Sequence, residues 1–512
     1  MWEQRSITAI NRSPLNGVAT TLERVGAQLA VRLKYETLFE NERARMQAFL
    51  SACRGHGSRF YVPYYGWTNR GSFSASELLS NNFFASGTTG WTAASATLDV
   101  QDQVGRIVHD GTFSVLPQIN RSATVVQYAP YVARALLTAG RGSFGSGGVY
   151  IANPGVFSMT DYASGLGMRT ASLVALSTTI DYAAVAGSNT SGYSLGDFVE
   201  CHYTSLSRCA QVDNGQNLFQ RSDELDNAYW TKSNATVSAN SDQSPFGTTT
   251  ADRLVEDGTT SQHRLTRAIT VTSDAQDVCI AIAARAQGRN FIVIGVTEGT
   301  GATSAETFFN LATGATGSGS TGGNWSNRRS FITPLGNSWY MCHLVVRKTN
   351  AATALTAYFM LGSADGTSSY AGDSSSAVRL SRATFAPSSV PTRLVQTTSA
   401  STTGTAQTGG ALHLKGLPAS TNGLLSQGDP AEVITVTSSQ LVRSRSALNS
   451  GAAGLGYFQF EAPLRVSPAD GAPVIIQRPL CRMMLDSNTV QWTEHSGGFC
   501  DLEFTAVEDT YP

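Results

Sequence analysis

The sequence has little charge and no long apolar run. Only 14% of its 512 residues are charged, and 36 basic residues are balanced by 37 acidic ones. Such a chain lacks the electrostatic footprint of a protein that binds nucleic acid or an anionic membrane surface. No stretch approaches the ~18 apolar residues that a membrane-spanning helix needs. We therefore expect neither nucleic-acid binding nor membrane insertion.

Paired cysteines and a leader segment are also missing. The seven cysteines are scattered and include no C-x-x-C pair, which favours reduced thiols over disulfides or structural zinc. The opening "MWEQRSITAINRSPLNG" has no apolar core of a secretory signal, so we expect a protein made in a cytosol. The motifs of phosphate loops and zinc proteases do not occur either. The expectation is a protein without cofactor or metal.

Helical periodicity is confined to one stretch. "ENERARMQAFLSACRG" (40–55) places Met46, Phe49, Leu50 and Cys53 on one face of a helix. Strands are predicted on either side, at "QLAVRLKYETL" and "SRFYVPYYGW". Elsewhere short alternating runs are separated by Gly, Ser and Thr, as is typical of strands joined by turns. The predicted fold class is mainly β.

A repeat occupies the middle of the chain. "RIVHDGT" (106–112) returns as "RLVEDGT" (253–259), 147 positions later, and Trp91 corresponds to Trp230 at an offset of 139. Two further phrases match in the same order. The chain therefore contains a duplicated module, at 73–214 and 215–396. Without helical periodicity, each copy is predicted to be a β-sandwich of jelly-roll type.

The two ends flank these modules. Residues 1–72 are too few to bury a core unaided, and 397–410 is a Thr/Ser/Gly-rich stretch typical of a flexible linker. We predict that 1–72 and 400–512 fold together as one discontinuous β-rich hub domain with a single helix. The two modules would then be insertions in it.

Both ends resemble one protein family. The "ARMQAFLSACRGHGSRFYVP" segment resembles the helix and following strand of siphophage distal tail proteins. Three later segments resemble the closing half of that family: "LHLKGLPASTNGLLSQGDPAEV", "FQFEAPLRV" and "FCDLEFTAVED". The resemblance implies a homohexameric ring at the tail tip of a virion, between the tail tube protein and the tail tip hub protein. The repeated units look like carbohydrate-binding sandwiches of phage tails, which implies contact with a host cell-surface glycan.

Three tryptophans are candidates for sugar binding, because an aromatic ring stacks on the apolar face of a pyranose. Trp325 lies in "TGGNWSNRR" with Asn324 and Arg328 beside it, and this Gly/Asn-rich composition is typical of an exposed loop. Trp91 and Trp230 hold the same position in the two modules. That correspondence favours packing in a core, with ligand contact as the alternative.

Paired carboxylates would be needed for a glycosidase. Glu224 with Asp226, or Glu256 with Asp257, are nominal acid–base pairs. Yet Asp257 precedes Gly in a phrase present in both modules, and Asp-Gly is a turn signal. We expect a turn role, no catalytic residue and no enzymatic activity.

Two further motifs are weak. His202 follows Cys201, but neighbours in a strand face opposite sides of a sheet. "GRGSFG" (140–145) lacks the helix that follows a nucleotide-binding loop. The alternative to a ring protein is a receptor-binding fibre or a tail-borne polysaccharide depolymerase. A fibre would carry its attachment segment at one terminus only.

Overall fold

The structure, a computed structural model, is built almost wholly of antiparallel strands. Among the described residues there is a single α-helix, and the predicted mainly β class is confirmed. No helix in the described part of the chain has the length and apolarity to cross a membrane. The description covers residues 2–509 except 6–7, 13–18, 24–27, 39, 54–58, 64–77, 80–83, 102–103, 113–115, 140–146, 155–161, 165–166, 187–193, 300–303, 406, 408, 436–437, 462, 488–490 and 497–498.

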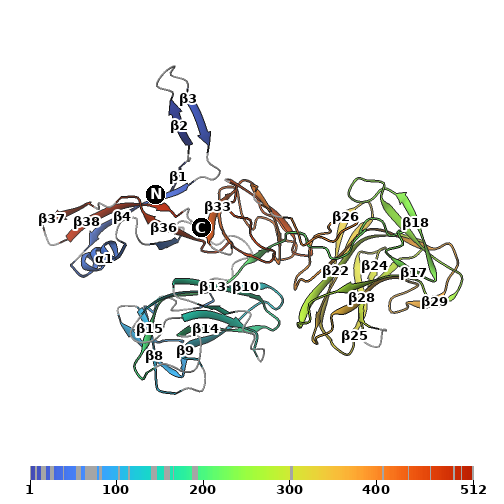
Figure 1. The fold of residues 1–512 in the computed structure, drawn as a ribbon, viewed down its shortest axis with the longest axis horizontal. Helices are drawn as coiled ribbons and strands as arrows, with labels where there is room; N and C mark the ends of the chain where they lie inside the picture. The colour runs from blue at the N-terminus through green and yellow to red at the C-terminus, as the bar shows by residue number, and fades with distance from the viewer. Residues whose placement is uncertain are drawn as a thin grey trace.

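The two ends of the chain build one six-stranded sheet (Figure 1). β4 (Gln28–Leu38) pairs with β38 (Phe499–Glu508), and β5 (Phe60–Pro63) pairs with β36 (Leu480–Leu485). β1 (Trp2–Arg5) extends the sheet beyond β4, and β37 (Gln491–His495) pairs with β38. The strands predicted near 28–38 and 500–508 are therefore direct neighbours.

The helix α1 (Glu40–Cys53) packs on this sheet. Its four apolar side chains at helical spacing share one core with the buried Phe504 of β38, and they are Met46, Phe49, Leu50 and Cys53. The predicted apolar face is confirmed. A separate hairpin, β2 (Thr8–Arg12) with β3 (Ala19–Glu23), forms a sheet of its own and extends away from the body in Figure 1.

A closed six-stranded barrel follows the end sheet. Five strands come from the C-terminal part of the chain: β31 (Ala411–Lys415), β32 (Pro430–Ile434), β33 (Ser439–Ser444), β34 (Gly456–Glu461) and β35 (Pro473–Ile475). The sixth is β16 (Ala210–Val212), which pairs with β31 and β35. The predicted module boundary at 214 is therefore too late, because the first module ends before residue 210. Leu441 of β33 reaches the core of the end sheet and joins the two units.

The two repeated modules are antiparallel sandwiches with matching strand orders. In module 1, one sheet runs β13 (Gly167–Val174), β10 (Pro130–Ala139), β15 (Phe198–Arg208), β8 (Val104–His109), β7 (Ala96–Gln101), and the other runs β12 (Tyr162–Ser164), β11 (Gly147–Ala152), β14 (Thr179–Ala186), β9 (Gln118–Thr124), β6 (Thr92–Ala94). A single apolar core lies between the sheets.

Module 2 repeats this plan and adds one strand at an edge of each sheet. Its first sheet runs β26 (Trp325–Gly336), β27 (Trp339–Lys348), β22 (Gln276–Gln287), β30 (Ala377–Ala386), β19 (Ala251–Glu256), β18 (Ala235–Asp242), and its second runs β25 (Ala315–Thr321), β24 (Ser304–Asn310), β23 (Phe291–Glu298), β28 (Ala354–Gly362), β21 (Arg264–Thr270), β17 (Thr231–Ser233). A small sheet of β20 (Thr260–Gln262) and β29 (Ser369–Ala371) lies at one end. The additions are β25 and β26, which have no counterpart among the described strands of module 1.

One residue carries the chain from sheet to sheet at the same place in both copies. Ser95 separates β6 from β7 with φ 48°, and Asn234 separates β17 from β18 with φ 52°. The left-handed conformation turns the chain sharply enough to change sheets after a three-residue strand. Both modules thus share a local device as well as a topology.

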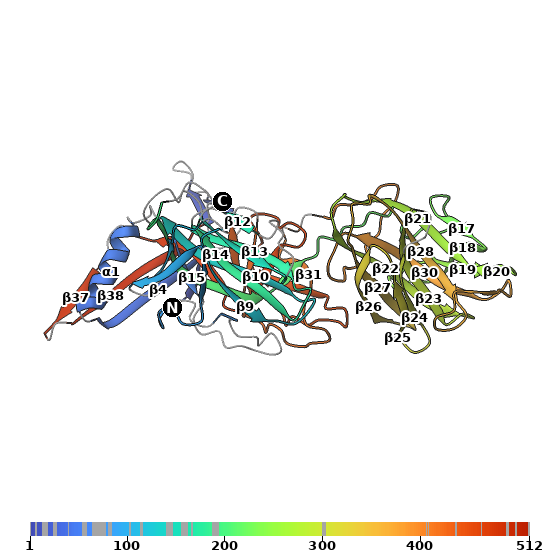
Figure 2. The same cartoon turned by 90° about the horizontal axis from the view of Figure 1, so that it is seen from below.

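The stretch predicted to be a flexible linker, 397–410, is instead paired with the start of module 2. The backbone N–H of Asn217 donates to the carbonyl of Thr402 at 2.9 Å, and that of Thr405 donates to Asn214 at 2.8 Å. Thr397 is buried, and its hydroxyl donates to the Phe219 carbonyl at 2.8 Å. The chain enters and leaves module 2 along one antiparallel path (Figures 1 and 2). The prediction failed because a Thr-rich composition is compatible with strand-like pairing as well as with a flexible coil.

Module 1 docks on the barrel through a buried ion pair. Nη1 of Arg134, on β10, lies 2.8 Å from a carboxylate oxygen of Glu432, on β32, and both side chains are at most 3% exposed. The same carboxylate accepts the N–H of Leu480 at 2.8 Å. Val132, Cys209 and Ile475 form a small apolar cluster beside it. This contact favours one docking arrangement, because separating the pair would leave each buried charge without its partner.

Candidate functional site

The tryptophans shared by the two modules are core residues. Trp91 is 8% exposed and its ring centroid lies 5.8 Å from that of Tyr182. Trp230 is 1% exposed, lies 4.8 Å from Phe219, and donates from Nε1 to the Arg221 carbonyl at 3.0 Å. The packing interpretation accounts for both rings, and neither ring face is open to a sugar.

The interpretation of Trp325 as an exposed loop residue is wrong. The turn "TGG" ends before it, Trp325 begins β26, and its side chain is 5% exposed within the module 2 core. Asn324 donates to Glu298 Oε2 at 3.0 Å, and Arg328 donates to Thr307 Oγ1 at 2.7 Å. These three side chains therefore engage separate partners and do not form one stacking surface.

The nominal acid–base pairs are structural. Asp257 Oδ1 accepts the N–H and hydroxyl of Thr259, at 3.0 and 2.5 Å. Asp110 does the same for Thr112, at 2.9 and 2.6 Å. The predicted turn role is confirmed in both modules. In the other pair, Glu224 forms a half-buried ion pair with Arg221 at 2.8 Å.

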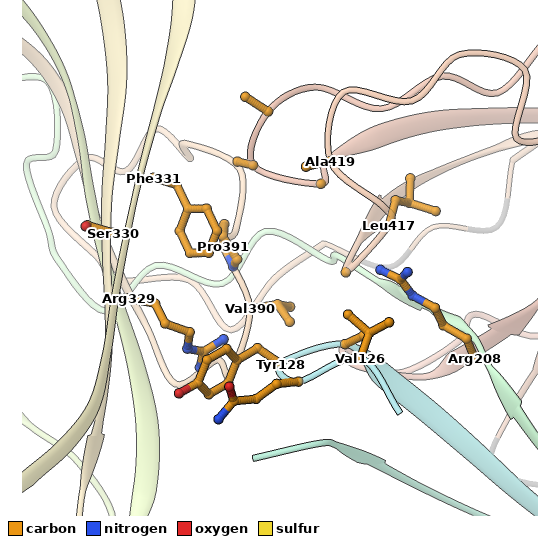
Figure 3. Close-up of a pocket in the computed structure, with 16 residues that line it drawn as sticks. Val126, Tyr128, Arg208, Arg329, Ser330, Phe331, Val390, Pro391, Leu417 and Ala419 are labelled. Carbon is orange, nitrogen blue, oxygen red and sulfur yellow. The ribbon is translucent and has the colours of Figure 1, made fainter. Parts of the chain in front are cut away.

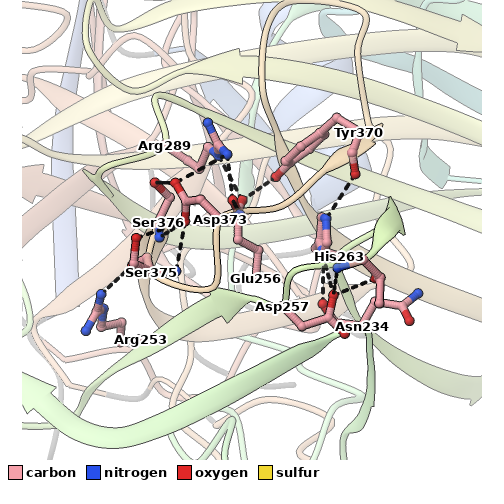
Figure 4. A network of polar contacts seen from close by, with 11 residues as sticks. Asn234, Arg253, Glu256, Asp257, His263, Arg289, Tyr370, Asp373, Ser375 and Ser376 are labelled. Atoms are coloured by element: carbon pink, nitrogen blue, oxygen red, sulfur yellow. Dashed lines mark hydrogen bonds and ion pairs between the residues drawn. The ribbon is translucent and has the colours of Figure 1, made fainter.

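Glu256 is the centre of a polar network at one end of module 2 (Figure 4). Its buried carboxylate accepts from both Nε and Nη2 of Arg289, from the Tyr370 hydroxyl at 2.7 Å and from the Asp373 N–H at 2.9 Å. Burial raises the pKa of Glu256. The hydrogen bonds, of which those from Arg289 have the largest effect, together lower it by more, so the pKa of Glu256 is below its usual value. A carboxylate held ionised by four donors is unsuited to act as a general acid.

His263 lies beside this network and is fully buried. Nδ1 is 2.7 Å from the Asn234 carbonyl oxygen, and Nε2 is 3.3 Å from the Tyr370 carbonyl oxygen. Asp257 lies 3.4 Å from the ring (Figure 4). Each ring nitrogen thus lies against a backbone carbonyl oxygen. The histidine connects the turn of Asp257 to the loop that holds Tyr370.

The Cys–His candidate is not assembled for nucleophilic chemistry. Cys201 is fully buried, and burial raises the pKa of its thiol to about 12. His202 faces Thr138, with Nε2 and the hydroxyl oxygen 2.9 Å apart. All seven cysteines are free and buried. The "GRGSFG" motif at 140–145 lies outside the described residues.

Across the described ranges, no group of three or more His, Cys, Asp or Glu side chains is arranged to hold an ion.

A cavity of about 420 Å³ lies where both modules meet the barrel (Figure 3). Module 1 contributes the β9–β10 turn and the end of β15. Module 2 contributes β26 and the segment after β30. The barrel contributes its 416–419 and 452–454 loops. Prominent lining side chains are Tyr128, Arg208, Arg329, Phe331, Val390 and Leu417.

Arg329 is the polar group that distinguishes this cavity. Its side chain is 8% exposed, and its guanidinium carbon lies 4.2 Å from the ring centroid of Tyr128, in the other module. Its Nε and Nη2 are buried and meet no hydrogen-bond acceptor among the described residues. Burial lowers the pKa of Arg329, while the charge of Asp277 acts in the opposite direction. Arginine nevertheless stays protonated at neutral pH.

Sequence reasoning missed this cavity. Its walls come from residues near 128, 330 and 417, and none of the three segments has a local binding motif. The only sequence signal was the "NRR" phrase, in which Arg328 was the candidate and its neighbour Arg329 faces the cavity.

Comparisons with known proteins add little. No family model and no curated protein sequence matches the chain. Similar solved structures include the enzymatically active domain of bacteriophage CBA120 tailspike protein 4, at 12% identity and TM-score 0.22, over 34% of this chain and 21% of that one. The mosquito-larvicidal Cry4Aa toxin of Bacillus thuringiensis matches at 9% and 0.17, over 65% and 58%. The T=3 Penaeus vannamei nodavirus matches at 8% and 0.13, over 64% and 97%. The chain thus spans well under two thirds of the tailspike chain, and TM-scores this low carry no argument about fold or function.

Proposed function

We propose that this chain is a structural subunit of a long, non-contractile phage tail. It forms the homohexameric ring at the distal end, between the tail tube protein and the tail tip hub protein. It is assembled in the host cytoplasm, resides in the virion, and acts without catalysis. The two sandwich modules face outward and contact host-surface saccharides.

The observation that carries this proposal is the common sheet of the two chain ends. Leu29 and Glu508 are 479 positions apart, yet the N–H of Leu29 donates to Glu508 Oε2 at 3.1 Å. The segments that resemble distal tail proteins supply α1, β5 and β38 beside or within this sheet, and β31, β32 and β34 of the barrel. A tail-binding unit made from both ends, with two modules inserted, suits a ring subunit better than a fibre attached by one terminus.

Exposed aromatic side chains support self-association through the end sheet and barrel. Tyr35, Trp492 and Tyr457 are 37%, 47% and 50% exposed, whereas in the described parts of the modules the exposed large apolar side chains are only Val126 and Leu195. Aromatic residues are enriched in protein interfaces. The β2–β3 hairpin adds support, because an isolated two-stranded hairpin is marginally stable and gains from a neighbouring subunit.

The mass of the purified assembly tests the ring. A mass near six times 54.2 kDa is expected by light scattering, and Trp492→Ser should lower it. Leu195→Ser, which changes a 75% exposed side chain of module 1, is the matched control and should leave the mass unchanged. A stable trimer would favour the fibre alternative.

Electron microscopy of virions tests the orientation. Density for the end sheet is expected around the tail axis, with the sandwiches outside it, and sandwiches lining the lumen would contradict the proposal. Binding of the whole protein to a glycan array tests the saccharide contact. If no glycan binds, the modules act as spacers.

A further inference from the structure

We propose that the cavity between the two modules and the barrel binds a small organic oxyanion, a carboxylate or phosphate with an apolar ring face. The bound ligand would connect module 2 to module 1 and to the barrel. This inference does not rest on the ring proposal, because the cavity belongs to a single chain.

The charge in the cavity selects an anion. Arg329 holds two buried N–H groups with no acceptor among the described residues, and burying such donors without an acceptor is costly. The Asp277 carboxylate offsets part of the charge of Arg329, and its Oδ2 also accepts a hydrogen bond from Arg347 at 3.3 Å. The guanidinium of Arg208 approaches the same cavity from the opposite wall (Figure 3). Planar guanidinium groups bind carboxylates and phosphates through paired hydrogen bonds.

The other lining residues determine the size of the ligand and favour a ligand with an apolar face. The volume of about 420 Å³ is at the lower end of the range of small-molecule sites, roughly 300–1,000 Å³. Phe331, Val390 and Leu417 supply apolar walls from module 2 and the barrel. The ring of Tyr128 is covered on one face by Arg329, so it orients the guanidinium instead of stacking on a ligand. Inorganic anions would leave these apolar walls unused.

The ligand would favour one arrangement of the three units. Each unit contributes a wall, so binding requires all three in place and stabilises that arrangement by mass action. The guanidinium that makes the site comes from β26, a strand with no counterpart among the described residues of module 1. The site therefore depends on a strand that distinguishes the second module from the described part of the first.

Titration calorimetry on the whole protein tests the ligand class. The probes are glucuronate and glucose 6-phosphate, with glucose as the neutral control. At least one anion is expected to bind about tenfold or more tightly than glucose, and comparison of the two anions distinguishes carboxylate from phosphate. Equal binding of glucose, or binding of no probe, overturns the proposal.

Matched variants test the location. Arg329→Gln should weaken the anion about tenfold or more. Arg267→Gln is the control, because Arg267 also stacks on a tyrosine of module 2, with its guanidinium carbon 3.6 Å from the Tyr229 ring centroid, and lies outside the cavity. It should leave the affinity unchanged. Equal loss in both variants would indicate non-specific attraction and overturn the proposal.

A second variant guards against misfolding of the first. Ala452→Leu narrows the cavity from a half-buried barrel position without altering charge. It should weaken binding of the anion while the thermal midpoint without ligand stays within about a degree or two of the parent, as for ordinary surface changes. Unchanged affinity in Ala452→Leu would place the anion elsewhere.

Discussion

Module 1 and module 2 share a scaffold and differ in their polar chemistry. The tryptophan before the first strand, the left-handed residue between the sheets and the aspartate of the turn occur in both. At the end of β8, module 1 has His109, whose Nε2 lies 3.0 Å from the Thr112 carbonyl oxygen. At the same place module 2 has Glu256 and its network. The shared elements define the fold, and the differing ones are where each copy diverged.

A second pair of equivalent positions shows how packing and polarity exchange. Gly105 of module 1 lies against Phe84, where a Cβ would come within 2.8 Å of the ring. Its counterpart in module 2 is Asp252, a buried carboxylate that accepts the N–H groups of Leu225 and Asn240, at 2.6 and 2.8 Å. An aromatic ring fixes the opening loop in one copy, and a carboxylate fixes it in the other.

We predict that the added strand β26 contributes to the core of module 2. Trp325→Ala tests this, and it has the largest expected effect on stability of the substitutions compared. Removing a buried indole should lower the free energy of unfolding by about 4 kcal/mol, because the cavity left behind cannot collapse fully. Chemical denaturation followed by fluorescence measures it. Arg328→Gln, three residues along the same strand, should change stability little. A Trp325 variant that keeps its stability but loses glycan binding would restore the ligand role.

Because of the Glu256 network, substitution at this position should reduce the stability of module 2 more than substitution at the equivalent position, His109, reduces that of module 1. Glu256→Gln should cost about 3 kcal/mol, since Arg289 would lose its buried partner. His109→Gln should cost less, because His109 makes its bonds to the adjacent turn. Calorimetric scans of both variants provide the comparison. Equal losses would mean that the network adds nothing to the stability of module 2.

The Asp252 carboxylate should give module 2 a pH dependence that Gly105 cannot give module 1. Burial raises the pKa of Asp252 to about 6, against the opposing N–H groups of Asn240 and Leu225. The folded state then binds a proton more tightly than the unfolded chain. Its stabilisation is complete below about pH 4 and is lost as the pH rises through 6, on the order of 2 kcal/mol in all.

The difference between the parent and Asp252→Asn isolates this contribution. Other groups titrate in the same range: burial lowers the pKa of His343 to about 4, which stabilises the fold as the pH rises. We expect the denaturation midpoint of the parent to fall relative to that of Asp252→Asn as the pH rises from about 4 to about 8, because only the parent carboxyl ionises in that range. Parallel pH profiles would therefore contradict the prediction.

Sequence reasoning reached what depends on local pattern. The helix face around Phe49, the duplication and the turn role of Asp110 follow from periodicity and spacing, and the structure confirms them. It failed where tertiary contacts decide. Trp325 follows a Gly-rich turn, and only the packing of β26 on β27 shows that its ring is buried. The cavity had no local signal, because its walls are brought together by docking of three separate units.

The sheet-to-sheet kink offers the smallest and most direct comparison of the modules. Ser95 and Asn234 both have positive φ, a conformation that costs a β-carbon residue energy and glycine almost none. Asparagine tolerates it better than serine. Asn234 also donates from Nδ2 to the Ser261 hydroxyl at 2.9 Å and the Gln262 carbonyl at 3.2 Å. Glycine at either position should relieve about 0.5–1 kcal/mol of backbone strain, and Asn234→Gly should be close to neutral, because the loss of its two hydrogen bonds offsets that relief. Differential scanning calorimetry on the two variants decides between them. If both substitutions stabilise equally, the Asn234 amide contributes nothing, and the two kinks are energetically the same.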